Sequence, residues 1–418
     1  MRRALLALGV VAIAAAVMLP GALGGASATP GVTARSVTIG GTFPFSGPAS
    51  SYAPIPVGMK AYLSFVNATR TNGRRGVFGR QIIFDAEDDG YNPANTVQRT
   101  KQLVEQTKVF ALVGGLGTEP QQAVTAYANQ QKVPQIYVST GATEWGAKHA
   151  DHPWTIGWQP DYQAEAAIYG RYILKNLPNA KVGVIYQNDS YGKDYIAGLE
   201  AGLGKAHKSQ IVITQGFEVT DTSVTNQVLA MRRAGVDTVM IFGTPTPTIR
   251  TYATMAAIGW KPENIFVNSV SATDTFMGIA VARAGAAEVN GSISVYYTKD
   301  PANPIWNNDA GMKLYKSIMT RFAPAGAKVT DGLYIYGVAK AYTFVQALRA
   351  AGPNPTRDSL MKAVLNMNDK SNPFLLPGVV TKTGPGDYFP ISQQQLIRFN
   401  NGTWAPFGPL TDTRPKGL

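Results

Sequence analysis

Val37-Thr38-Ile39-Gly40-Gly41-Thr42 is a short apolar segment that runs into the loop Phe45-Ser46-Gly47-Pro48. The same pattern returns at Val109-Phe110-Ala111-Leu112-Val113, which runs into Gly114-Gly115-Leu116-Gly117-Thr118. A stretch with helical periodicity follows each loop, and strands that alternate with helices predict a parallel sheet. Ligands of such sheets bind at the carboxyl ends of the strands, where these glycine- and hydroxyl-rich loops lie.

The pattern occurs in two runs, which predicts an α/β fold with two doubly wound, Rossmann-like lobes. The strands expected in the first run lie near 37–42, 81–85, 109–113 and 133–138. The strands expected in the second run lie near 181–186, 210–217, 238–242, 265–268 and 292–297. Helices follow over about 307–322, 332–351 and 356–367, and Asn401-Gly402 predicts the turn of a hairpin. A cleft between two lobes is typical of proteins that capture a small solute.

Two local signals indicate where helices begin. Asn92-Pro93 suits a helix start, because Asn caps free amide groups and Pro lacks an N–H that would be unpaired there. Thr118-Glu119-Pro120-Gln121 has the spacing of a capping box.

Residues 1–28 have the composition of a cleaved secretory leader. Arg2 and Arg3 precede an apolar stretch over 4–19, and Ala26-Ser27-Ala28 matches an A-x-A cleavage site. We therefore expect the mature chain to be periplasmic or secreted.

The composition excludes several classes of chemistry. The chain of 418 residues has no cysteine, so it has no disulfide, no thiol nucleophile and no lipid anchor on a cysteine. The formal net charge of +12 is spread along the chain, apart from a local cluster over 70–80. Scattered charge of this kind is typical of a solvated surface, and we expect no nucleic-acid partner.

No pattern of residues predicts an enzyme, a metal site or a cofactor. His149 and His152 lack a third ligand, and the acidic run Glu87-Asp88-Asp89 is explained by a solvated strand end or a helix-cap partner. The sequence has neither a G-x-S-x-G elbow nor a phosphate-binding Walker loop. A secreted hydrolase is the alternative, but three scattered histidines without cysteine speak against it.

Several phrases, in this order and spacing, resemble one family over nearly the whole mature chain. The phrases are Phe45-Ser46-Gly47-Pro48, Glu87-Asp88-Asp89, Leu112-Val113-Gly114-Gly115, Asn188-Asp189-Ser190-Tyr191-Gly192-Lys193-Asp194, Gly235-Val236-Asp237-Thr238-Val239 and Arg398-Phe399-Asn400-Asn401-Gly402-Thr403-Trp404. The family is that of the periplasmic solute-binding proteins of ABC importers for branched-chain amino acids, the Leu/Ile/Val-binding type.

The resemblance implies a type I periplasmic binding protein fold, in which three segments join the lobes and the lobes close on a ligand. The crossings would fall near Thr155–Trp158, Ser294–Tyr297 and Pro373–Gly378. Lobe I would comprise 29–156 and 297–372, and lobe II would comprise 157–296 and 373–418. The implied partners are a small-molecule solute and the transmembrane subunits of an ABC permease, and we expect a monomer.

The resemblance also implies a set of ligand contacts. In the family, a hydroxyl and backbone amides hold the ligand's carboxylate, and the matching loops here contribute Gly117, Thr118, Gly141, Ala142 and Thr143. Helix caps explain Thr118 and Thr143 equally well. Further candidates are Tyr191, which closes over the ligand in the family, together with Thr244, Ser271 and the rim residues Ser46 and Tyr52.

One departure from the family leaves the ligand open. The Leu/Ile/Val binders place a glutamate, which pairs with the ligand's ammonium, where this chain has Asn268-Ser269-Val270-Ser271-Ala272. Either Asp274 reaches the ligand or the solute lacks an ammonium, because a buried ammonium without a carboxylate is unfavourable. Amino acids are slightly favoured over other organic acids or amides. A sensor subunit of the same fold is a further alternative.

Overall fold

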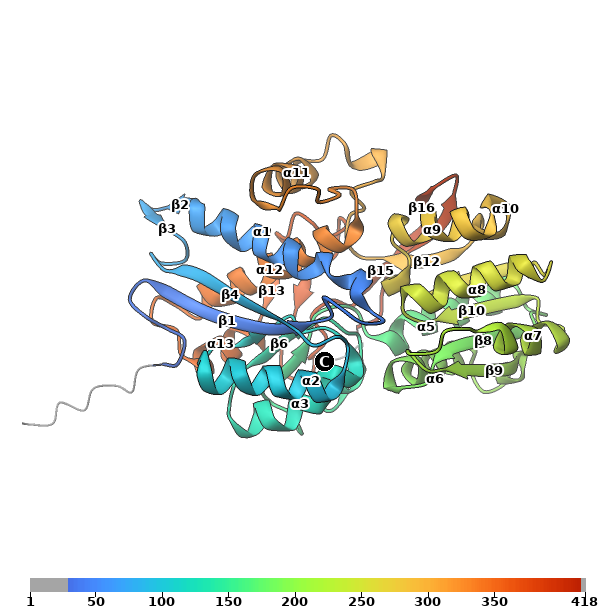
Figure 1. Ribbon diagram of the computed structural model, residues 1–418, viewed down its shortest axis with the longest axis horizontal. Helices are drawn as coiled ribbons and strands as arrows, with labels where there is room; N and C mark the ends of the chain where they lie inside the picture. The colour runs from blue at the N-terminus through green and yellow to red at the C-terminus, as the bar shows by residue number, and fades with distance from the viewer. Residues whose placement is uncertain (1–28, 415–418) are drawn as a thin grey trace, which may run out of the picture.

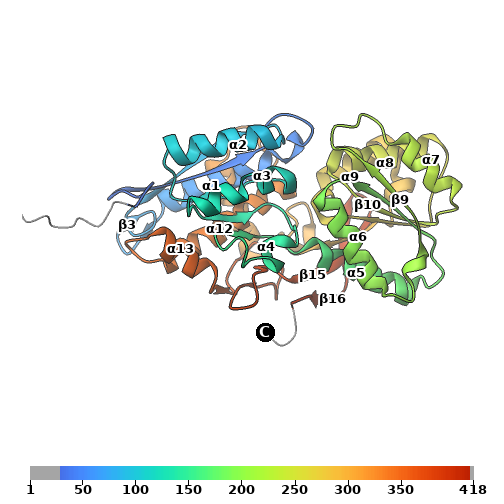
Figure 2. The ribbon, with the colours of Figure 1, turned by 90° about the horizontal axis from the view of Figure 1, so that it is seen from below.

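The computed structural model describes residues 29–414, and it contains two α/β lobes that lie side by side along the long axis (Figures 1 and 2). The predicted leader, residues 1–28, lies outside the described residues. Lobe I is built on a five-stranded sheet with the order β4-β1-β5-β6-β7, in which every pair is parallel. Lobe II is built on a seven-stranded sheet with the order β16-β15-β12-β11-β10-β8-β9.

The elements of lobe I come from two separate parts of the chain. The first part contains β1 (Ser36–Phe43), η1 (Ser50–Tyr52), α1 (Pro54–Ala68), β2 (Arg70–Thr71), β3 (Arg74–Arg75), β4 (Gln81–Asp88), α2 (Pro93–Lys101), the π-turn η2 (Gln102–Gln106), β5 (Leu112–Val113), α3 (Thr118–Gln130), β6 (Gln135–Val138), α4 (Glu144–Ala147) and β7 (Thr155–Gly157). The second part contains η5 (Pro304–Trp306), α11 (Ala310–Phe322), α12 (Gly332–Ala350), α13 (Arg357–Val364), β13 (Asn368–Asp369) and β14 (Thr381–Lys382).

Lobe II follows β7 and is completed by the terminal hairpin. Its elements are α5 (Tyr162–Asn176), β8 (Val182–Gln187), α6 (Ser190–Leu203), η3 (Lys208–Gln210), β9 (Ile211–Phe217), α7 (Thr225–Arg233), β10 (Thr238–Phe242), α8 (Pro245–Ala257), β11 (Asn264–Val267), η4 (Ser269–Ser271), α9 (Asp274–Ala284), α10 (Ala286–Val289), β12 (Ile293–Tyr296), β15 (Gln393–Asn400) and β16 (Thr403–Asp412). The five strands β8, β9, β10, β11 and β12 are parallel to one another. The strands β15 and β16 pair in the antiparallel direction.

The central strands are apolar throughout because helices cover both faces of each sheet. In β10, Val239 and Ile241 belong to the core under α7, α8 and α9. The alternate residues Met240 and Phe242 belong to the core under α5 and α6. A parallel strand that is buried on two faces leaves no position for polar side chains except at its ends.

The predicted helix starts had different outcomes. The Asn92 side chain accepts hydrogen bonds from the N–H groups of Ala94 and Asn95, so the predicted cap of α2 is confirmed. The predicted capping box at Thr118 is wrong, because α3 begins at Thr118 itself and its cap residue is Gly117, with φ of 101°. The Thr118 hydroxyl instead contacts the Thr140 hydroxyl at 2.6 Å.

The third crossing between the lobes lies later than the resemblance implied. Phe374, Leu375 and Val379 pack in the apolar core of lobe I together with Ile391. The chain joins the second sheet only at Gln393, where β15 begins. The prediction that lobe II resumes at residue 373 therefore differs from the observed packing, because these apolar residues fill the first core before the chain crosses.

Of the residues from 29 to 414, none belongs to a helix long and apolar enough to span a membrane.

Two glycines allow α1 and α12 to cross at close range. A Cβ atom on Gly337 would lie 2.1 Å from the carbonyl oxygen of Ile55, and one on Gly58 would lie 2.2 Å from the carbonyl oxygen of Tyr334. The contact brings Tyr52, in η1 just before α1, and Tyr336, on α12, toward the same edge of lobe I.

We predict that Gly337→Ala lowers the free energy of unfolding by about 2 kcal/mol, because the added methyl group forces two helix backbones apart. The matched control is Gly278→Ala in α9, where nothing lies within 4 Å of the added Cβ. There the loss of backbone entropy in the unfolded chain should raise stability by about 0.5–1 kcal/mol. Urea denaturation followed by circular dichroism measures both, and equal effects of the two substitutions would contradict the prediction.

Candidate functional site

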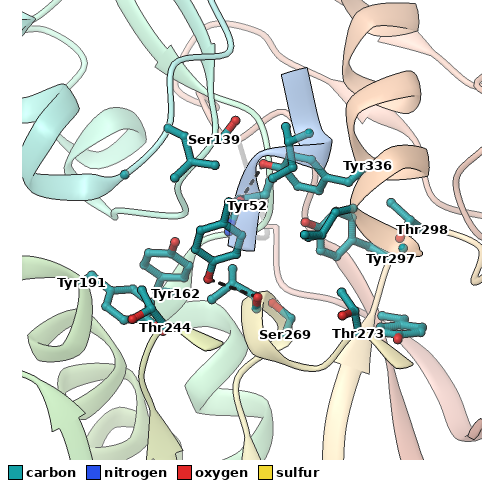
Figure 3. Close-up of a pocket in the computed structure, with 18 of the residues that line it drawn as sticks. Tyr52, Ser139, Tyr162, Tyr191, Thr244, Ser269, Thr273, Tyr297, Thr298 and Tyr336 are labelled. Carbon is teal, nitrogen blue, oxygen red and sulfur yellow. Dashed lines mark hydrogen bonds between the residues drawn. The ribbon is translucent and has the colours of Figure 1, made fainter. Parts of the chain in front are cut away.

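A cavity of about 80 Å³ lies between the two lobes, and residues of both lobes and of the crossing segment after β12 line it. Its most frequent side chain is tyrosine. The seven lining tyrosines are Tyr52, Tyr91, Tyr162, Tyr191, Tyr296, Tyr297 and Tyr336. Figure 3 shows side chains from opposite sides that point toward one another. Tyrosine rings give an apolar wall with hydroxyl groups at their tips, which suits a small ligand with both apolar and polar parts.

The lobe I wall consists of the loops after β5 and β6. Leu116, Gly117 and Thr118 come from the first loop, and Ser139 comes from the second. A Cβ on Gly117 would lie 2.6 Å from the Tyr91 ring, and its positive φ disfavours any other residue. The Ser139 hydroxyl donates to the carbonyl oxygen of Gly114 at 2.7 Å. The two loops are thus joined at the edge of the cavity.

A backbone irregularity in β6 precedes Ser139. Tyr137 has φ of 53°, and the register between β6 and β7 shifts between Ile136 and Val138. A bulge of this kind re-aims the residues that follow it. Ser139 therefore reaches the cavity although it comes directly after a buried strand.

The lobe II wall is held by a network of buried polar groups. The Asn268 amide donates to Tyr191 and, at 3.0 Å, to the carbonyl oxygen of Gly243. The buried Glu165 carboxylate accepts from the backbone N–H of Ser269 at 2.8 Å and from its hydroxyl at 2.6 Å. These bonds fix Tyr191 and the loop at Ser269 on the cavity wall.

Direct contacts join the lobes across the cavity. The Tyr52 hydroxyl, from η1 of lobe I, donates to the carbonyl oxygen of Val270 in η4 of lobe II at 3.2 Å (Figure 3). The Tyr52 ring also meets Phe276 edge to face at 6.3 Å between centroids. The Tyr336 hydroxyl donates at 2.7 Å to Gln159, in the segment that follows β7.

Five of the ten predicted contacts line this cavity: Tyr52, Gly117, Thr118, Tyr191 and Thr244. Their role as ligand contacts stays a prediction.

The other five predicted residues lie outside the lining. Ser46 is exposed, and the Ser271 hydroxyl donates to the carbonyl oxygen of Gly243 at 2.6 Å. Gly141 and Ala142 line a separate, much smaller pocket, and Gly141 serves close packing, since a Cβ there would lie 2.3 Å from the carbonyl oxygen of Pro160. Thr143 donates through its hydroxyl to Asp161 and through its backbone N–H to Asp194.

Many residues of the cavity wall were not predicted from the sequence. Ser139 lies just before the loop that contains the predicted contacts Gly141, Ala142 and Thr143, so its position after a strand could have indicated it. Tyr336 lies inside the helix α12, and Asp300 follows the strand β12. No local sequence pattern distinguishes either residue from an ordinary core or surface residue. The missed lining residues that bear on the chemistry are Tyr91, Ser139, Gln159, Tyr162, Tyr296, Tyr297, Asp300 and Tyr336.

Comparison with known proteins agrees with this architecture. A family model described as "Periplasmic binding protein" matches residues 36–394, which is most of the chain. This chain belongs to the periplasmic binding protein family. Members of the family bind solutes and are not enzymes.

Individual relatives of this periplasmic binding protein are distant in sequence. It is 22% identical over 211 residues to Leu/Ile/Val-binding protein homolog 3 of Brucella melitensis, and the match spans about half of the length of that relative (54%) and 50% of this chain.

Solved structures match over almost their whole length. A possible leucine/isoleucine/valine-binding protein from Rhodopirellula baltica has a TM-score of 0.75 at 20% identity, covering 91% of this chain and 98% of that one. A branched-chain amino acid ABC transporter protein from Thermus thermophilus with bound valine has a TM-score of 0.77 at 16% identity, with 91% and 97% covered. A fatty acid ABC transporter substrate-binding protein from Thermomonospora curvata has a TM-score of 0.76 at 19% identity, with 94% and 96% covered. These likenesses establish the fold.

An acidic pair lies at the end of this binding protein's cavity that the segment after β12 forms. Asp300 lines the cavity and is 5% exposed. Its Oδ2 atom and both carboxyl oxygens of Asp274 are buried without any hydrogen-bond partner besides the other carboxyl group of the pair. Burial, and then repulsion by Asp300, raises the pKa of Asp274 to about 9. Asp274 itself is not among the lining residues, so of the two carboxyl groups it is Asp300 that faces the cavity. Within residues 29–414, no group of His, Asp and Glu is arranged to hold a metal ion.

We predict that Asp274→Asn becomes more stable relative to the native protein as pH rises from 5 to 8.5, by about 1.4 kcal/mol for each pH unit and thus by several kcal/mol in all. The folded chain holds a proton on Asp274 that the unfolded chain releases above about pH 4, so the stability of the native protein falls as pH rises toward 9. An asparagine side chain carries no charge and removes this dependence.

Thermal unfolding of both proteins at several pH values measures this effect. Asp151→Asn, at an exposed position, is the control and should leave the pH dependence unchanged. A stability difference that is the same at pH 5 and pH 8.5 would count against a protonated Asp274.

Proposed function

We propose that this protein is the exported solute-binding subunit of an ABC importer, which captures a small carboxylate-bearing solute by hinge closure and delivers it to a membrane permease. The observation that supports the proposal most directly is the cavity, because both lobes and a crossing segment between them contribute to its wall. A solute that touches both lobes favours the closed arrangement by the difference between its affinities for the closed and open states. We further propose that the protein acts as a monomer.

The lobe I wall suits the carboxylate of the solute. The helix α3 has 13 residues and begins at Thr118, beside the cavity. The first N–H groups of a helix lack partners within the helix, and the positive end of its dipole favours an anion. Gly117 lets the backbone come close, and the Thr118 hydroxyl adds a hydrogen-bonding group.

The end of the cavity at Asp300 suits a cationic or hydrogen-bond-donating group. Asp300 is a buried carboxyl group of the cavity wall whose donors are the backbone N–H of Ala302 and the neighbouring Asp274, and a buried carboxyl group of this kind favours a ligand that donates to it. Asp300 thus supplies the acid that is missing from the stretch 268–272. This favours an amino acid, of branched-chain type by the resemblance, over an organic acid or amide without an ammonium. One solved relative is described with bound valine and another is described as a fatty acid transporter protein, and both classes belong in the test.

We predict that L-leucine or L-valine binds more tightly than its counterpart without an amino group, 4-methylvalerate or isovalerate, and more tightly than octanoate. Asp300→Asn should weaken amino acid binding by tenfold or more, because it removes the charge that faces the ammonium, and should change the binding of the deaminated acids much less. Isothermal titration calorimetry measures both effects.

Small-angle X-ray scattering tests closure in the same samples. The radius of gyration should fall when a bound solute is present and should not change with a compound that does not bind. Binding without any compaction would contradict hinge closure. Tighter binding of octanoate than of either amino acid would contradict the amino acid assignment.

A further inference from the structure

A fully buried lysine lies directly behind the lobe I wall of the cavity. Lys340, in the middle of α12, is 0% exposed. Its Nζ donates to the carbonyl oxygen of Gly114 at 3.0 Å and to the Ser139 hydroxyl, and Ser139 lines the cavity. Lys340 is therefore one hydrogen-bonded group away from the space in which we place the solute.

The surroundings of Lys340 contain no negative charge. Among residues 29–414, no Asp or Glu oxygen lies within 4.0 Å of its Nζ, since no ion pair includes this lysine. The Phe43 ring of β1 lies at 5.9 Å and the Tyr336 ring of α12 at 5.0 Å. A Cβ atom on Gly114 would lie 2.9 Å from both the Lys340 Nζ and the Met59 Cε, so Met59 of α1 lies beside Gly114 together with the lysine. Tyr336 is the titratable group of this set, and its hydroxyl donates to Gln159.

The charged form of a lysine is disfavoured in such a place, because nothing of opposite charge compensates for its lost hydration. Two polar contacts and two ring faces do not replace the hydration of an ammonium ion, and burial lowers the pKa of Lys340 well below its usual value. A carboxylate in the cavity reverses this balance, because an opposite charge at short range in a poorly hydrated site favours the ammonium form.

We propose that Lys340 is the specificity-determining counter-charge for the carboxylate of the solute, acting through Ser139, and that it takes up a proton from solvent when the solute binds. The proposal rests on the proposed function, since it assigns the charge of the solute within the same cavity. The step conserves charge: one carboxylate anion and one proton enter, and the neutral amine becomes an ammonium ion that remains hydrogen-bonded to Gly114 and Ser139. The Ser139 hydroxyl turns its one hydrogen from the carbonyl oxygen of Gly114, to which it donates in this structure, to the carboxylate.

Proton uptake has a defined pH signature. Between the pKa of Lys340 in the free protein and its higher pKa in the complex, carboxylate affinity should fall up to tenfold for each unit of rising pH. The Asp274–Asp300 pair at the other end would respond in the opposite direction, because an ammonium placed beside it favours proton release. Solutes without an amino group therefore isolate the contribution of Lys340.

The experiment uses isovalerate, 4-methylvalerate, hexanoate and benzoate, each with its primary amide. Calorimetric titration at pH 7.5 in phosphate and in Tris, which have different ionisation enthalpies, gives the number of protons exchanged. For the acids we expect an uptake of roughly 0.5 to 1 proton, and for any amide that binds we expect none. Lys340→Met should abolish the uptake and weaken acid binding tenfold or more while leaving amide binding unchanged. The control Lys362→Met alters an exposed lysine of the same lobe and should change neither quantity.

The proton count on the native protein stands even if the Lys340→Met variant fails to fold. Acid binding that is the same in both buffers, equal binding of acids and amides, or no binding of any acid would overturn the proposal. If Lys340 only holds the Gly114 loop, its substitution weakens acids and amides alike. If a neutral amide binds and compacts the protein while the acids do not bind, the result supports solute capture and contradicts the role of Lys340. If neither acids, amides nor amino acids bind, the proposed function falls with it.

Discussion

The parallel arrangement of the strands is the constraint on which the binding site depends. Because helices cover both faces of each sheet, residues inside the strands are apolar, and polar groups gather in the loops at the carboxyl ends. In lobe I, the ends of β5 and β6 supply Leu116, Gly117, Thr118 and Ser139 to one wall, and the end of β10 supplies Thr244 to the opposite one. The core and the site are thus two consequences of the same topology, and substitutions that move a strand also move the cavity wall.

The strands and most helices could be predicted because their signals are local. Apolar segments of four to eight residues mark the buried strands, and Asn92 and Asn401-Gly402 mark a helix start and a hairpin turn. The third crossing was misplaced because Phe374 and Leu375 have the apolar character of a strand but fill the core of lobe I. Which core an apolar residue joins depends on contacts that are distant in sequence, so a local pattern does not report it.

The site was predictable only where it coincides with a strand end. Gly117, Thr118 and Thr244 lie in such loops, and the structure places them on the wall. Tyr336 and Lys340 lie one turn apart inside α12, far along the chain, and reach the cavity edge because Gly58 and Gly337 let α1 and α12 cross closely. A tyrosine and a lysine at helical spacing are indistinguishable in sequence from residues of any partly buried helix. Only their contacts distinguish them: Tyr336 donates to Gln159, and Lys340 donates to Ser139.

Two buried ionisable groups, Lys340 and Asp300, lie at different ends of the cavity and would complement the two charges of a zwitterion. Lys340, behind Ser139 in lobe I, would attract a negative group, and Asp300, on the segment after β12, would attract a positive one. Both groups are buried, and burial lowers the pKa of Lys340 and raises the pKa of Asp300, which disfavours the charged form of each. A zwitterionic solute would charge both ends together, with proton uptake at Lys340 and proton release at the Asp274–Asp300 pair. The two exchanges oppose each other, and the affinity for an amino acid would then vary little with pH, whereas a solute that carries only one of the two charges would be bound in a pH-dependent way. Such a cavity would distinguish a zwitterion from a simple acid by the pH dependence of the affinity for each, as well as by their shapes.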